Sequence, residues 1–83
     1  MEFRGHQFQV DFYESADERL PFRYHLRIHP IGFYPDFNHE MERDVEEKLT
    51  RAGIPHSPVC RVMDVFVSFT CKAEAMRAKL CLS

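Results

Sequence analysis

The segment FRYHLRIH, residues 22–29, decides the fold because two chemically opposite sets of side chains alternate along it. Side chains leave a β-strand on opposite sides with a period of two, so this pattern predicts a strand with one apolar and one polar face. The apolar set, which we expect to face a core, is Phe22, Tyr24, Leu26 and Ile28. The polar set, which we expect on the opposite surface, is Arg23, His25, Arg27 and His29. This surface either contacts a ligand or partner, or is simply solvated, with Asp11 or Asp64 pairing with the arginines across strands.

A second alternating segment precedes this strand. In QFQVDFY, residues 7–13, the side chains of Phe8, Val10 and Phe12 share one face. The connection between the two segments is shorter than the dozen or so residues that a parallel crossover needs. We therefore expect an antiparallel hairpin, with Pro30 ending its second strand because proline lacks the ladder donor.

A helix is predicted at 38–52. Asn38 is a preferred N-cap residue, Lys48 and Arg51 suit the negative end of the helix dipole, and Gly53 follows the last turn. The helical spacing predicts an apolar stripe of Met41, Val45, Leu49 and Ala52. The outer face is acidic, with Glu40, Asp44, Glu46 and Glu47.

A third strand is predicted at 62–70 and a last helix after Thr70 or Cys71. Along the strand, one face carries Met63, Val65, Val67 and Phe69, and the other carries Asp64, Phe66, Ser68 and Thr70. We expect the helix to line one side with Ala73, Met76, Arg77 and Leu80.

These elements predict a single small α+β domain, residues 1–83, built as a two-layer sandwich with the order β-β-α-β-α. A crossover through the first helix would lay the third strand beside the first. We therefore expect a three-stranded antiparallel or mixed sheet in the order 2-1-3, with two helices on one face. Open sheet edges would favour pairing with a partner or with a second copy.

Composition limits the function classes. Hydrophobic residues make up 45% of the chain, enough to expect a folded core. The formal net charge of −2 lacks the basic excess of a general nucleic-acid binder. Three cysteines without a close pair indicate a reducing compartment, and the chain shows neither a signal-peptide pattern nor a long apolar run. We expect a cytoplasmic protein.

The catalytic and metal-binding signals are incomplete, so we expect no cofactor and no metal. His25 and His29 would lie about 13 Å apart along a strand, too far to hold one ion. The pair His56 and Cys60 lacks a clustered second half. Cys71 precedes a helix, where the dipole can lower a thiol pKa, but no catalytic partner is assigned to it.

Residues 66–69, FVSF, resemble the end of the RNP1 signature of RNA-recognition motifs, and the following KAEAMRAKL resembles the helix after it. The resemblance implies that Phe66 stacks on a base. Met63 stands where the signature has a glycine, and Asp64 stands where it has another aromatic. A helix rather than a hairpin is also expected before this strand, so we assign no family.

The sequence favours a non-enzymatic protein-interaction module, an adaptor or inhibitor, as a monomer or homodimer. The predicted contact residues are Arg23, His25, Arg27, His29 and Phe66 on the sheet, and Phe33, Tyr34 and Phe37 in the loop. Two alternatives stay open. One is a binder of RNA, other single-stranded nucleic acid or a phosphate ligand that uses the same face. The other is a small thiol enzyme centred on Cys71.

Overall fold

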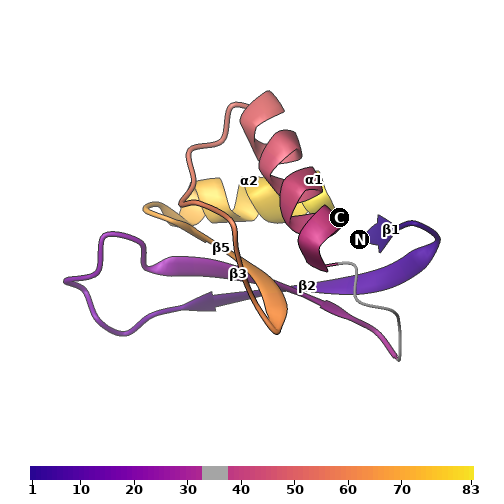
Figure 1. Ribbon diagram of the computed structural model, residues 1–83. Coiled ribbons are helices and arrows are strands. Elements are labelled where there is room, and N and C mark those ends of the chain that lie inside the picture. Colours follow the sequence, from indigo (N-terminus) through magenta and orange to yellow (C-terminus); the bar gives the residue numbers. More distant parts are fainter. Residues whose placement is uncertain (33–37) are drawn as a thin grey trace.

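The structure is a computed structural model that describes residues 1–32 and 38–83. Five strands form one sheet, and two helices cover one of its faces (Figure 1). The predicted α+β class and the placement of both helices on one face are thereby confirmed. The loop aromatics Phe33, Tyr34 and Phe37 lie outside the described residues.

The strands are β1 (Glu2–Phe3), β2 (His6–Glu14), β3 (Tyr24–Pro30), β4 (Cys60–Val62) and β5 (Asp64–Phe69). The helices are α1 (Asn38–Arg51) and α2 (Lys72–Leu82). In space the strands follow the order β1-β2-β3-β5-β4, and each neighbouring pair is antiparallel. The sheet therefore has five strands rather than the three expected from the sequence.

The predicted hairpin of β2 and β3 is present and supplies the middle of the core. Val10 pairs with Ile28, and Phe12 pairs with Leu26. Leu26 and Ile28 are fully buried, as their alternation predicts. The extra strand β1 pairs with the start of β2 through a two-residue turn, in which Arg4 and Gly5 both have positive φ (52° and 80°).

The predicted third strand, residues 62–70, is mainly β5, and the short strand β4 before it was not predicted. The chain turns between them at Met63, with a φ of 64°. This turn separates β4 from β5 and reverses the chain direction. As a result β5 runs antiparallel to β3 and pairs with it, and the predicted order 2-1-3 is wrong. The strand parallel to β3 is β4, so α1 joins two parallel strands with β5 inserted between them, a split β-α-β unit.

The sequence predicted most of the buried face of α1 correctly, but not the buried face of α2. On α1, Met41, Val45 and Leu49 are fully buried, whereas Ala52 follows the helix end and is exposed. On α2, the predicted face is wrong. Its buried residues are Ala75, Ala78 and Leu82, while Ala73 and Leu80 are exposed.

Candidate functional site

The sheet face away from the helices is the candidate site, and we call it the open face. Strand alternation places on it the side chains that do not face the core. They come from the three longest strands: Gln9, Asp11 and Tyr13 of β2; His25, Arg27 and His29 of β3; Asp64, Phe66 and Ser68 of β5. The structure therefore brings four predicted contact residues together, namely His25, Arg27, His29 and Phe66.

Carboxylates from neighbouring strands contact two residues of the predicted cationic stripe. Arg27 Nε donates to Asp64 Oδ2 at 2.9 Å, which ties β3 to β5. His29 Nε2 lies 2.7 Å from Asp11 Oδ2, which ties β3 to β2. The hydrogen bonds from His29 and, second, from Gln9 hold the pKa of Asp11 below its ordinary value. The arginine and the histidine at the centre of the face are thus satisfied within the domain.

His25 takes part in a second cross-strand cluster. Its Nδ1 lies 2.6 Å from Ser68 Oγ, and the Tyr13 ring stacks on the imidazole with centroids 4.9 Å apart. Burial lowers the pKa of His25, so the ring is neutral at pH 7. A serine beside a neutral histidine has the composition of a nucleophile and its base, yet within residues 1–32 and 38–83 this ring contacts Ser68 and Tyr13 and is not oriented by a carboxylate.

Arg23 lies one residue before β3, at the end of the hairpin. Its Nη2 donates to the Ser15 carbonyl at 3.4 Å and lies 3.9 Å from the Glu14 carboxylate. Its guanidinium also lies 5.7 Å from the centre of the Tyr24 ring. These contacts hold Arg23 against the hairpin, and the structure does not bring it together with His25, Arg27, His29 and Phe66.

A shallow depression of about 680 Å³ lies in the open face. It is lined by Asp11, Phe12, Tyr13, Arg27, Met63, Asp64 and Phe66. The Arg27–Asp64 ion pair is therefore part of its wall. Two exposed apolar residues line the same depression as that pair. Tyr13 is 45% exposed and Met63 is 91% exposed.

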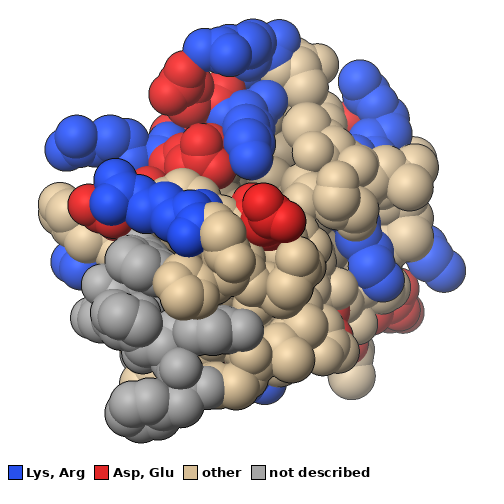
Figure 2. Space-filling model, turned by 90° about the vertical axis from the view of Figure 1, so that its right-hand side faces the viewer, with Lys and Arg blue, Asp and Glu red and all other residues tan. Residues whose placement is uncertain are grey.

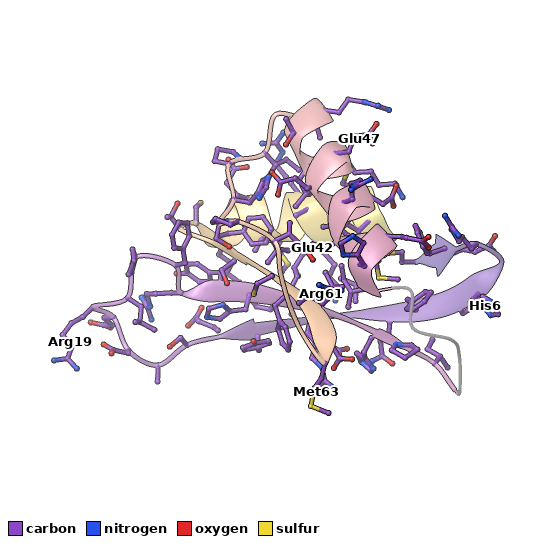
Figure 3. The ribbon with its side chains drawn as sticks, in the orientation of Figure 1. His6, Arg19, Glu42, Glu47, Arg61 and Met63 are labelled. Carbon is purple, nitrogen blue, oxygen red and sulfur yellow. The ribbon has the colours of Figure 1, made fainter. Side chains whose placement is uncertain are left out.

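Met63 is the site residue that sequence reasoning missed. It was assigned to the apolar core face, but it occupies the turn between β4 and β5 and points away from the helices (Figure 3). A turn with positive φ is usually marked by glycine or asparagine, and the sequence around Met63 has neither. The alternation of Met63 and Asp64 instead fits a continuous strand, so no residue pattern in the sequence indicates this turn.

The predicted acidic surface of α1 is neutralised by cations. Glu40 pairs with Arg4 at 3.0 Å, and Asp44 pairs with Lys48 at 3.0 Å. The remaining carboxylates of the helix pair with Arg51, His56 and Arg61. Figure 2 shows acidic and basic side chains interleaved on one flank of the molecule, and Figure 3 shows Arg61 beside Glu42. This surface therefore carries acidic and basic side chains side by side and is not an acidic patch.

The cysteines lie on the surface as free thiols. Cys71 is the N-cap residue of α2, as expected, but its side chain makes no capping hydrogen bond. Within residues 1–32 and 38–83, no group of three or more metal-ligating side chains lies close enough to hold an ion. The predicted thiol chemistry of Cys71 stays a prediction.

Over the same described ranges, neither helix combines the length and the apolar character needed to cross a membrane.

Comparisons with protein-family models, curated proteins and solved structures found no match to this chain.

Proposed function

We propose that this domain binds another protein through the open face, as a non-enzymatic adaptor or inhibitor. The observation that carries the proposal is the position of Met63. Its side chain is 91% exposed, its backbone is left-handed, and it lines the same depression as Tyr13 and Phe66. A left-handed conformation costs a residue with a Cβ about 1–2 kcal/mol, and backbone strain of this kind gathers at functional sites.

The apolar rim of the depression supplies the binding energy in this proposal. Covering an exposed methionine side chain contributes about 1.5–3 kcal/mol. Methionine and aromatic residues are enriched at protein interfaces, where a few buried anchors carry most of the affinity. Met63 and Phe66 are the anchors, and Tyr13 forms the opposite wall.

The polar centre of the depression favours a partner with an apolar side chain rather than a charged one. Arg27 and Asp64 already neutralise each other at 2.9 Å. A phosphate would have to compete with Asp64 for the guanidinium. A partner that inserts an apolar side chain beside the pair would leave its hydrogen bond intact.

The shape of the depression also favours a macromolecule. Small-molecule sites bury about 70–90% of their ligand, which requires an enclosed pocket. This depression is open along the sheet and is bounded by side chains from β2, β3 and β5. Such a surface fits the flat contact area of a folded partner.

The test compares apolar side chains of the open face with an exposed apolar side chain on α2. A photo-reactive residue placed at Met63 should crosslink to a partner in cells, and the partner is then identified by mass spectrometry and purified. Met63→Ser and Phe66→Ser should each weaken its binding at least tenfold in calorimetry. Leu80→Ser is the matched control, because Leu80 is 78% exposed on α2 and should leave the affinity unchanged. Equal losses in all three variants would contradict the proposal.

Nucleic-acid binding is the second candidate, and one observation favours it. Phe66 lies on β5 directly beside Arg27 of β3, and a hairpin, not a helix, immediately precedes β5. This removes one of the differences from RNA-recognition motifs. The ion pairs of Arg27 and His29 count against it. It requires affinity for single-stranded RNA that falls steeply between 50 and 200 mM salt, by about 10³-fold or more for several phosphate contacts.

A further inference from the structure

The outer edge of β2 is the longest stretch of unpaired strand in the described residues. β1 pairs only with His6 and Gln7, and the backbone of Met1 exchanges hydrogen bonds with Phe8 at 2.7 and 3.0 Å. Beyond Phe8, the described strands pair with β2 only on its β3 side. An open edge of this kind is a template for another strand.

The hydrogen-bond pattern shows which backbone groups point outward. The Ser15 N–H donates to the Arg23 carbonyl at 2.7 Å, and the Ile31 N–H donates to the Gln7 carbonyl at 3.2 Å. In an antiparallel ladder these bonded positions alternate, so the odd-numbered residues of β2 bond to β3. The N–H and C=O groups of Val10, Phe12 and Glu14 therefore point away from β3.

The opposite edge of the sheet is better protected. β4 spans only Cys60–Val62, and Pro58 lies just before it. Arg61 of this short strand is held by Glu42 of α1. Short strands and nearby prolines and charges are the devices that keep an edge from pairing. The edge of β2 carries no proline between His6 and Glu14.

We propose that a second copy of this chain occupies the β2 edge, with the two β2 strands antiparallel about a two-fold axis at Phe12. In this register Phe12 lies opposite Phe12 of the second copy, and Val10 lies opposite Glu14. All outward backbone groups of Val10, Phe12 and Glu14 then pair. The resulting dimer has one continuous sheet.

Two observations select this register. Sliding the second strand toward the start of β2 would place its Glu14 opposite Phe8, whose outward groups are already bonded to Met1. Sliding it the other way would leave Val10 unpaired. An isologous contact also requires that the same patch complement itself, which a centre at Phe12 satisfies.

The charges of the edge fit the same register. Asp11 lies opposite Tyr13 of the second copy, so no two carboxylates face each other. Asp11 is also offset by His29 at 2.7 Å, and Glu14 by Arg23 at 3.9 Å. On the helix side, the Phe12 ring stacks parallel to Tyr24 at 6.5 Å, and the second Phe12 would extend this apolar layer.

This inference does not rest on the proposed function. In the proposed dimer, the open faces of the two copies form one continuous surface, whichever partner that surface binds. Because the paired segment is short, we expect a dimer that dissociates on dilution.

The test is the molar mass by light scattering at rising protein concentration. The wild-type mass should rise from that of one chain, 9.9 kDa, toward twice that value. Glu14→Pro removes one outward N–H, does not break a bond to β3, and should lower the dimer association constant at least tenfold. Glu14→Gln is the matched control, because it removes the same charge, keeps the N–H and should dimerise like the wild type.

Phe12→Lys is the second variant, since it places two like charges on the two-fold axis. It should keep the protein monomeric, with circular dichroism confirming that it folds. Hydrogen exchange on the wild type gives a readout without any substitution. The amides of Val10, Phe12 and Glu14 should gain protection as concentration rises, while those of β4 should not. A wild-type protein that stays monomeric, or a dimer unaffected by Glu14→Pro and Phe12→Lys, would overturn the inference.

Discussion

Arg27 of β3 and Asp64 of β5 form an ion pair across the open face, with Nε and Oδ2 2.9 Å apart. This pair changes the meaning of the strongest signal in the sequence. The alternation of FRYHLRIH predicts a stripe of basic side chains, and the structure places Asp64 against Arg27 and Asp11 against His29 at its centre. What remains exposed around the pair is apolar, which is why we propose a protein partner.

The Arg27–Asp64 pair should add modestly to stability, since the Asp64 side chain is only 18% exposed. A double-mutant cycle of Arg27→Ala and Asp64→Ala in urea unfolding should give a coupling energy of about 0.5–1 kcal/mol, weaker at 1 M salt. The exposed Arg19–Asp17 pair is the control and should give about zero. A coupling no larger than that of the control would contradict the geometry.

Met63 should be strained by its left-handed backbone, with φ of 64°. Met63→Gly and Met63→Ala both remove the side chain, but glycine alone adopts this conformation without a Cβ clash. We therefore expect Met63→Gly to be about 1 kcal/mol more stable than Met63→Ala in thermal or urea unfolding. An alanine variant as stable as the glycine variant would show that the turn carries no strain.

The pH dependence should report on His25, whose pKa burial lowers from the ordinary value of 6.5. Because the unfolded chain takes up this proton at higher pH than the folded one, stability should fall as pH drops below about 6.5 and toward the folded pKa. His25→Gln should flatten this loss, whereas exposed His39→Gln should not. Unfolding free energies between pH 5 and 8 test the sign. The same slope in both variants would exclude His25 as its source.

The free energy of unfolding should depend more on a buried residue of β3 than on the outer face of α2. Leu26 is fully buried, and Leu26→Ala should cost about 2–5 kcal/mol, a large part of the stability of a domain this size. Leu80→Ala, at 78% exposed, should change it by less than about 0.5 kcal/mol. Urea unfolding of both variants tests this contrast. Similar losses would mean that α2 packs through a different face.

Local patterns predicted part of this fold well. Alternation correctly placed Leu26 and Ile28 in the core, and helical spacing correctly placed Met41, Val45 and Leu49 under α1. These predictions succeed because each depends on a single element with a clear period. The hairpin of β2 and β3 follows as well, since its connection is too short for a crossover.

The misses concern turns and weak patterns. The turn at Met63 lacks glycine and asparagine, so the sequence does not reveal the short strand β4 before it, and the predicted sheet order is wrong. On α2 the buried residues Ala75, Ala78 and Leu82 do follow helical spacing, but apolar residues also occur on the other sides of the helix, so the pattern does not single out the buried face. The pairing of Arg27 with Asp64 is one of the two cross-strand pairings that the sequence suggests, and the sheet order decides which carboxylate takes part.

The most direct test of the central claim is photo-crosslinking from position 63 compared with position 80. Our account predicts a discrete protein adduct from position 63 that disappears when Phe66 is changed to serine, and no such adduct from position 80. Binding of the purified partner should then fall at least tenfold in Met63→Ser. Adducts of equal yield from both positions, or an adduct with RNA alone, would contradict a protein-binding open face.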